Sequence, residues 1–353
     1  MTSKSIFRYL LVGTLALSVV FQSCKKDDDD QNPGKNYSNG LFITNEGAFQ
    51  TGVGTVSFWS RDNQIRDNDI YNTINGVPLG NVAQSTTVHN NKVYTVVNNS
   101  GKMEVVNAET YVRTGTVTGL ELPRYFVGLN DNKGYVSEWV GFSGNGRIAV
   151  IDLNTYQVTS TITVGALPEK MVLVGNKLYV TNSNDTTISV INTTTDAVES
   201  TISIGDWPTS ITKDKNGDIW VICNGIPSYA GTPTSPSLVK FNPATPTVQT
   251  TFDFGTPDNS PSRLVINGDG DKLYYLYSGG VYELAIGAAA LNSLPIISRN
   301  FYSLGIDPQT GNLYGGDALD YISPGRVIKY NTTYTAVDSF TTDIIPTDFT
   351  FVN

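Results

Sequence analysis

Between residues 177 and 211 the chain alternates short apolar runs with short polar breaks. The runs are Leu178–Asn182, Thr187–Asn192, Ala197–Ile204 and one that opens at Ser210. They are rich in β-branched and aromatic residues, whereas the breaks hold Gly, Pro, Asn, Asp and Thr. This pattern predicts short antiparallel strands joined by tight turns. Four such strands followed by a proline-marked exit, here Gly205–Pro208, are typical of one β-propeller blade.

The run that begins at Leu178 recurs along the chain, each time with an aromatic residue in the same place. These aromatic residues are Phe42, Tyr94, Tyr135, Tyr179, Trp220, Tyr274 and Tyr314. Their successive spacings are 52, 41, 44, 41, 54 and 40 residues. A period of about 40 to 50 residues with four strands per unit belongs to propellers. The pattern therefore predicts seven blades, with the aromatic residue on the second strand of each.

The two ends of this pattern complement each other. The first blade begins at Leu41 with its second strand, and the last residues, Pro346–Asn353, read as an innermost strand without a blade of its own. Pairing these segments would close the ring and leave no free edge between the first and last blades. We therefore predict an all-β, seven-bladed propeller of four-stranded antiparallel blades over residues 41–353.

The most regular segments read LYVTN, TISVINTTTDAV and TISIGDWPTSI. They resemble the YVTN, or YncE-like, propeller family, and the resemblance covers nearly everything after residue 40. It implies the fold, whereas function depends on the site that each propeller carries.

Residues 1–23 have the pattern of a secretory signal peptide. Lys4 and Arg8 precede an apolar run, Leu10–Phe21, which is too short to span a bilayer as a stable helix, and Cys24 follows. The segment resembles a bacterial lipoprotein signal, which implies that Cys24 is lipidated as the first residue of the mature chain. The alternative is an ordinary cleaved signal with a chance cysteine.

Residues 24–40 read as an acidic and polar linker. The run Asp27–Asp30 resembles the export signal of Bacteroidetes lipoproteins, which implies anchoring at the outer face of the outer membrane. A charge run is otherwise a solvated spacer. The formal charge is −9 for the whole chain. An acidic protein of this kind is a poor partner for nucleic acid or for an anionic membrane surface.

Few residues are suited to catalysis or to metal binding. The single histidine, His89, lies in a predicted hairpin turn, where we expect it to be solvated. Ser-His-Asp or Cys-His machinery would have to use it, and a His-rich metal centre is impossible. Cys223 reads as a small core residue. We predict no resident cofactor, no metal and no enzyme, although acidic pairs for a propeller lyase or hydrolase stay open.

Topology indicates where a ligand would bind. The loops between strands two and three share one face with the links between blades. Several of these loops are long: Glu46–Gly54, Glu138–Gly146, Asn224–Pro236 and Asp317–Gly325. Long loops on a rigid scaffold are where binding residues concentrate. We therefore predict that ligand binds on this face.

The predicted binding residues combine aromatic rings with polar groups. From the loops come Phe49, Trp139, Phe142, Tyr229 and Tyr321, and from the links come Tyr125 and Trp207. The polar set is Glu46, Asn98, Arg124, Glu138, Asn182, Asn224 and Asp317. This mixture suits a large, neutral ligand rich in amides or hydroxyls. Some of the aromatic rings, Trp207 above all, have packing between blades as the alternative role.

The lipoprotein signal, the acidic run and the YVTN propeller together resemble the cell-surface propeller lipoproteins of Bacteroidetes, among them the cobalamin-binding BtuG type. The resemblance implies capture of cobalamin (vitamin B12) and its transfer to a TonB-dependent outer-membrane transporter. A surface propeller that binds a glycan or a protein is the alternative.

Overall fold

The computed structural model describes residues 35–49, 52–247 and 249–352. The signal peptide over residues 1–23, the lipidation at Cys24 and the acidic run all lie outside these residues. Contacts divide the chain after Pro33, and everything described below belongs to the second unit, Gly34–Asn353. In the described residues we find no helix that is both long enough and apolar enough to cross a membrane.

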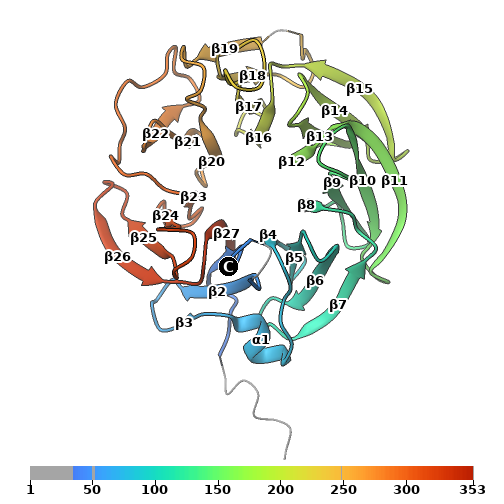
Figure 1. Cartoon of the computed structure of the whole chain (residues 1–353), viewed down its shortest axis with the longest axis vertical. Helices are drawn as coiled ribbons and strands as arrows, with labels where there is room; N and C mark the ends of the chain where they lie inside the picture. Colours follow the sequence, from blue (N-terminus) through green and yellow to red (C-terminus); the bar gives the residue numbers. More distant parts are fainter. Residues whose placement is uncertain (1–34, 50–51, 248, 353) are drawn as a thin grey trace, which may run out of the picture. The chain divides into compact units, whose positions relative to one another are not determined.

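Seven β-sheets stand like blades around a central axis (Figure 1). Two hollows that share Tyr125 and Lys170 lie inside the ring, and we call them together the central channel. The innermost strands, in blade order, are β27 (Pro346–Val352), β4 (Ala83–His89), β8 (Pro123–Gly128), β12 (Pro168–Val174), β16 (Pro208–Lys213), β20 (Ser262–Ile266) and β23 (Ser303–Ile306). The second strands are β1 (Gly40–Asn45), β5 (Lys92–Val97), β9 (Lys133–Glu138), β13 (Lys177–Asn182), β17 (Ile219–Cys223), β21 (Lys272–Tyr277) and β24 (Leu313–Asp317).

The outer half of each blade follows the same order. The third strands are β2 (Thr55–Ser60), β6 (Lys102–Asn107), β10 (Asn145–Asp152), β14 (Thr187–Asn192), β18 (Ser237–Phe241), β22 (Gly280–Ala285) and β25 (Arg326–Tyr330). The outermost strands are β3 (Arg66–Asp67), β7 (Arg113–Thr118), β11 (Gln157–Ala166), β15 (Ala197–Ser203), β19 (Gln249–Asp253) and β26 (Ala336–Thr341). Each predicted aromatic residue lies on a second strand, which confirms the seven-bladed prediction.

Two details differ from a regular ring. The sheet of blade six has three strands in the part of the chain that the structure describes, and residues 286–300 take the place of an outermost strand. Their β-pairing with the third strand is a single bridge between Val281 and Ile297. The link from blade one to blade two carries a short helix, α1 (Ile70–Asn75), capped by Asp69. The sequence analysis did not predict this helix, because six residues are too few for a helical period to stand out.

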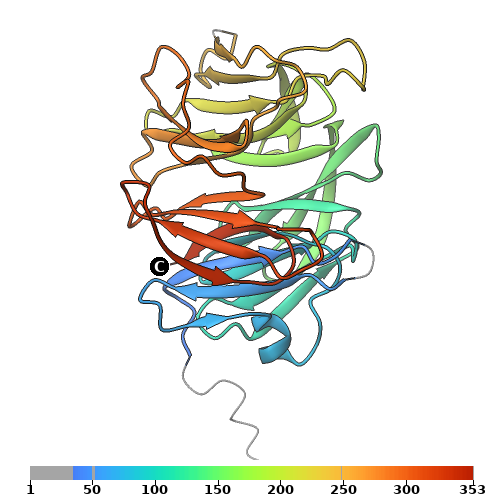
Figure 2. The same cartoon turned by 60° about the vertical axis from the view of Figure 1, so that its left-hand side comes forward.

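The ring closes as predicted. Strand β27 pairs antiparallel with β1 from Gly40 opposite Val352 to Asn45 opposite Pro346. The blue N-terminal strands and the red C-terminal strands accordingly lie side by side in both views (Figures 1 and 2). Arg61 adds a second link, because its Nη1 donates to the carbonyl of Val352. The innermost strand of blade one therefore comes from the far end of the chain.

The core consists of clusters that each join two neighbouring blades. In one of them Tyr94 of blade two stacks on Phe126 of blade three, with ring centres 4.3 Å apart. Blades seven and one share such a cluster too, in which Trp59 meets the edge of Tyr314. Cys223 is buried in the cluster between blades four and five, as predicted. Since every blade needs both neighbours to cover its faces, the propeller is held as a closed ring.

Two residues lie deeper than the sequence suggested. His89 is half-buried against blade three rather than solvated, with Nε2 2.9 Å from the carbonyl of Asn130. A side chain at Gly128 would collide with its ring, so this histidine is a contact between blades. Tyr37, which the sequence analysis placed in the linker, is buried against Phe58. The folded structure therefore begins before residue 41.

Candidate functional site

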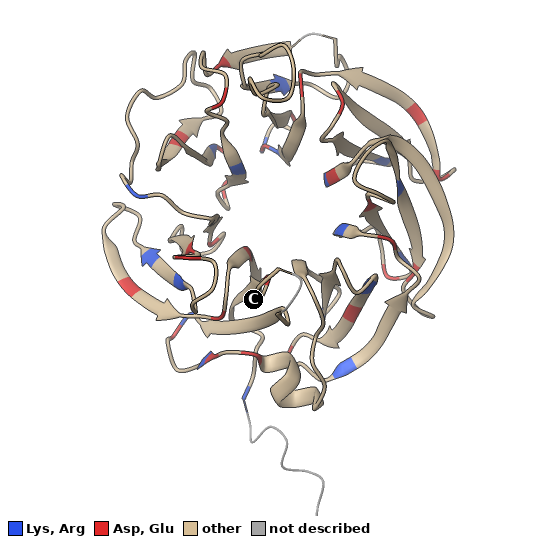
Figure 3. Ribbon diagram, viewed as in Figure 1, with Lys and Arg blue, Asp and Glu red and all other residues tan. Residues whose placement is uncertain are grey.

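One end of the channel widens into a hollow that we call the upper funnel. It lies where the second strands end and the innermost strands begin, and its volume is about 500 Å³. Several of the strands around the channel carry Lys, Arg, Asp or Glu residues (Figure 3). Eight predicted binding residues line it: Glu46, Phe49, Asn98, Arg124, Tyr125, Trp139, Phe142 and Asn224. The structure thus brings together loop residues from four different blades.

A repeated backbone device directs inner-strand residues into the upper funnel. In four blades the residue before the first proline of the innermost strand has a positive φ: Leu122 (45°), Leu167 (49°), Trp207 (54°) and Ile345 (60°). Left-handed backbone is unfavourable for such residues. Each is held by the amide of the residue that follows the second strand, for example Asn224 N to Trp207 O at 2.9 Å. The side chain after each proline then lines the upper funnel.

Arg124, on β8, is fixed by contacts on several sides. Its Nε donates to Glu169 Oε1 at 2.9 Å, and its Nη1 donates to the side-chain oxygen of Gln84. The guanidinium carbon also lies 4.0 Å from the centre of the Trp139 ring. The edge of Phe142 meets the same ring, with centres 6.5 Å apart. The aromatic wall of the upper funnel is therefore attached to a fixed charge network.

Across the upper funnel a second network joins blades six, seven and one. Arg263 donates from Nε to the carbonyl of Tyr302 at 3.0 Å, and its Nη2 lies 3.4 Å from Thr347 Oγ1. The Tyr302 hydroxyl donates to Glu46 Oε1 at 3.0 Å. Burial, reinforced by the Glu46 carboxylate, raises the pKa of Tyr302 above its ordinary value. This hydroxyl therefore stays a neutral donor at physiological pH.

Sequence reasoning missed several of these residues. Gln84, Glu169, Arg263, Tyr302 and Thr347 all line the upper funnel but lie on or beside innermost strands rather than in long loops. A signal was available for some of them, since a proline opens five of the inner segments and the following residue faces the channel.

Two predicted residues have buried side chains that hold the scaffold. Glu138 is fully buried and accepts from Arg147 Nε at 2.7 Å. Asn182, equally buried, donates to Thr187 Oγ1 at 3.0 Å and to Ser189 Oγ at 3.1 Å. Both stand at the end of a second strand and shape the loop that follows. They do not line the upper funnel.

The other four predicted residues lie further out. Trp207 and Tyr229 line a separate hollow of about 290 Å³ with Asp258. Asp317 accepts from Arg299 Nη2 at 2.7 Å. Tyr321 meets the edge of Tyr302, with ring centres 5.7 Å apart, and extends the aromatic surface outward from the upper funnel.

The upper funnel has the groups for recognition by hydrogen bonds and apolar contact. Its acids are engaged, Glu169 with Arg124 and Glu46 with Tyr302. In the residues that the structure describes, no three His, Cys, Asp or Glu side chains gather as metal donors. His89 lies at the opposite end of β4, away from the upper funnel.

Comparison with known families gives one match. A family described as a domain of unknown function (DUF5074) matches residues 39–314, which is more than half of the chain. Comparison with curated proteins finds no match.

Solved structures share the fold at low sequence identity. A quinonprotein alcohol dehydrogenase-like protein from Bacteroides thetaiotaomicron has a TM-score of 0.69 at 15% identity, covering 90% of this chain and 79% of that one. The periplasmic gluconolactonase of Pseudomonas aeruginosa has 0.65 at 10%, covering 89% and 99%. A functionally unknown protein from Desulfotomaculum acetoxidans has 0.66 at 13%, covering 90% and 99%. At these identities the likeness shows the fold alone.

Proposed function

The chain belongs to the DUF5074 family, and from the geometry of the upper funnel we propose that it is a ligand-binding propeller. One observation carries the proposal: the Trp139 ring packs on the Arg124 guanidinium and contacts Phe142, and all three side chains line the same hollow. Pockets of roughly 300–1,000 Å³ with apolar walls and a few fixed polar groups are typical small-molecule sites. Binding is favoured over catalysis because both glutamates of the hollow are already engaged.

The ligand that we propose is cobalamin, on the resemblance to Bacteroidetes surface lipoproteins. It is a large, flat molecule that carries many carboxamide groups. The carboxamides of Asn98 and Asn224 line the upper funnel and could exchange hydrogen bonds with such groups. Phe49 and Phe142 are exposed on the rim and would cover the part of the ligand that extends beyond the hollow. The proposed partner is a TonB-dependent transporter that receives the ligand.

Calorimetric titration of the chain without residues 1–24 tests the ligand. We expect cobalamin to bind, and Trp139→Ala to weaken binding at least tenfold. Thr194→Ala, an exposed change in a turn at the opposite end of the propeller, is the matched control and should leave the affinity unchanged. Binding of a glycan but not of cobalamin would show that the ligand is of another class. If the Trp139→Ala variant binds cobalamin as tightly as the parent, the binding site is not the upper funnel.

The proposed cell-surface location is tested separately. Cys24→Ala should release the protein from the membrane fraction. Replacing Asp27–Asp30 with neutral residues should keep the protein lipidated but hide it from protease added outside intact cells. Unchanged protease access after that replacement would contradict the export role of the acidic run.

A further inference from the structure

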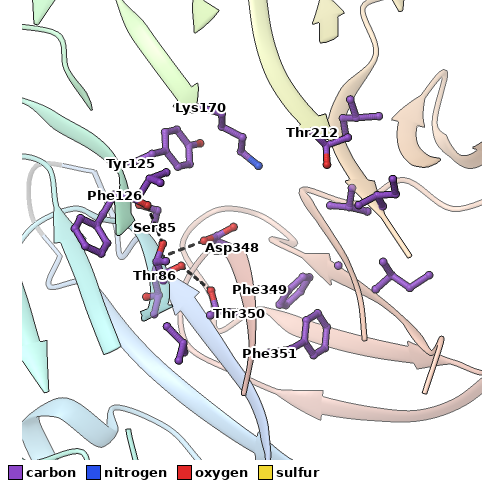
Figure 4. Close-up of a pocket in the computed structure, with 18 of the residues that line it drawn as sticks. Ser85, Thr86, Tyr125, Phe126, Lys170, Thr212, Asp348, Phe349, Thr350 and Phe351 are labelled. Carbon is purple, nitrogen blue, oxygen red and sulfur yellow. Dashed lines mark hydrogen bonds between the residues drawn. The ribbon is translucent and has the colours of Figure 1, made fainter. Parts of the chain in front are cut away.

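Below the upper funnel the channel continues into a second hollow, which we call the lower chamber. Its volume is about 490 Å³, and Tyr125 and Lys170 line both hollows at the level where they meet. Apolar side chains form much of its wall, including Phe126, Phe349 and Phe351 (Figure 4). The lower chamber is thus large enough for a small organic molecule.

Two opposite charges face this space from different blades. Lys170 extends from β12 and Asp348 from β27, and both side chains point into the channel (Figure 4). Asp348 Oδ2 accepts from the amide of Thr86 at 3.2 Å, and the Lys170 ammonium lies 5.5 Å from the centre of the Tyr125 ring. Among the described residues neither charge has an ion-pair partner within 4 Å.

Two of the hydroxyl groups nearby are already engaged. Ser85 donates to the carbonyl of Arg124 at 2.7 Å, and Thr350 donates to the carbonyl of Thr86 at 2.6 Å. These two hydroxyls are thus engaged within the wall, whereas Lys170 and Asp348 are left without a salt-bridge partner. Both side chains are half-buried. Charges withdrawn from water without a partner are costly, so a residue pair of this kind is a candidate for ligand binding.

The titration behaviour of the groups agrees with this geometry. Burial is the main cause that raises the pKa of Asp348 and lowers that of Lys170, because it disfavours each ionised form. The attraction between Lys170 and Asp348 opposes the effect of burial on both pKa values, and Arg263 and Glu169 are the other charges that act on Lys170. Burial also raises the pKa of Tyr125 to about 12, so its phenol stays a neutral hydrogen-bond donor.

We propose that the lower chamber is a second binding site, for a small zwitterion that carries one apolar group, such as an apolar α-amino acid. The ligand carboxylate would lie at Lys170 and the ligand ammonium at Asp348, with the apolar group among Phe349 and its neighbours. A zwitterion pairs both protein charges at once. A simple carboxylate would instead bring a like charge toward Asp348, and a simple amine toward Lys170. This proposal does not depend on the ligand of the upper funnel.

Calorimetric titration tests it, with phenylalanine and leucine added to the chain without residues 1–24. We expect both to bind, and 3-phenylpropanoate and phenethylamine, which each lack one charge, to bind at least tenfold more weakly. Equal affinity for either single-charge analogue would overturn the zwitterion assignment. Absence of binding by both amino acids at millimolar concentrations would overturn the site.

Four variants locate the binding. Lys170→Met and Asp348→Asn should each weaken phenylalanine binding at least tenfold, because each removes one charge contact. Thr212 lines the lower chamber but not the upper funnel, so Thr212→Phe should block binding without changing any charge. Trp139→Ala alters only the upper funnel and should leave phenylalanine affinity within twofold. If Trp139→Ala abolishes binding while Thr212→Phe does not, the ligand lies in the upper funnel and the proposal is wrong.

Discussion

The rim loops and the innermost strands both contribute to the upper funnel, but they hold their side chains in different ways. On the rim, Phe49 and Phe142 are 68% and 78% exposed. On the inner strands, the side chains of Arg124 and Glu169 are 16% and 10% exposed and bonded to each other. The loops thus offer apolar area that can adapt, whereas the strands offer polar groups in one geometry. A ligand would gain contact area from the first and orientation from the second.

The difference has a structural cause. Each innermost strand pairs with the second strand of its blade, and in four blades the strained residue before the first proline ties the two together. A loop residue such as Phe142 has no comparable restraint. If this comparison is right, substitutions on the inner strands should mainly lower the free energy of unfolding. Substitutions on the rim should mainly lower the affinity for ligand.

Removing an entire inner strand should have the largest effect on stability. Deleting residues 346–353 takes away the ladder with β1 and the buried side chain of Val352. We expect the free energy of unfolding to fall by more than about 3 kcal/mol, because fully burying one such side chain alone contributes about 1.5–3 kcal/mol. Chemical denaturation measures the loss. A truncated chain as stable as its parent would mean that ring closure contributes little.

Removing one fixed charge is the next largest change. Arg124→Met leaves Glu169 and Gln84 buried without their partner, and we expect a loss of about 2–4 kcal/mol in the free energy of unfolding. The matched control is Lys177→Met, which breaks an exposed pair with Glu199. Pairs of that kind contribute about 0–1 kcal/mol. Similar losses in the two variants would show that the inner ring is no more rigid than the surface.

Rim substitutions should affect ligand binding more than stability. We expect Trp139→Ala to cost about 2 kcal/mol of binding free energy, roughly thirtyfold in affinity, if the ring is a true anchor. Phe142→Ala should cost less, because that ring is largely exposed and held by one edge contact. Titration of each variant, with a thermal melt beside it, separates the two effects. If Phe142→Ala loses more affinity than Trp139→Ala, Phe142 rather than Trp139 is the main aromatic contact.

The smallest expected effect is a pH-dependent gain in stability. Burial raises the pKa of Asp348, so the cost of its ionised form appears as pH rises through the ordinary carboxyl range, and it is complete above the raised pKa. Asp348→Asn should therefore raise the melting temperature at pH 7 by up to about 4 °C, and the gain should shrink toward pH 4. Melting curves of parent and variant at both values measure it. A gain that grows as pH falls would contradict the sign.

The fold was predictable because its signals are local. A strand of alternating residues between turn formers can be recognised within about ten residues. Phe42 and Tyr314 could therefore be assigned to second strands, and the unpartnered segment Pro346–Asn353 predicted the closure. Blade six departs from the pattern where residues 286–300 replace a strand with irregular chain.

The site was less predictable, because it depends on which side chains converge. Glu138 and Trp139 are neighbours in sequence, yet the first is buried against Arg147 and the second lines the upper funnel. Strand register and the left-handed residue before four of the inner prolines decide such orientations, and neither can be read from the hydrophobic pattern. The sequence alone thus determined seven blades, their order and the face with long loops. Only the tertiary structure placed Arg263 and Tyr302 opposite Arg124, because contacts between distant blades arise when the ring closes.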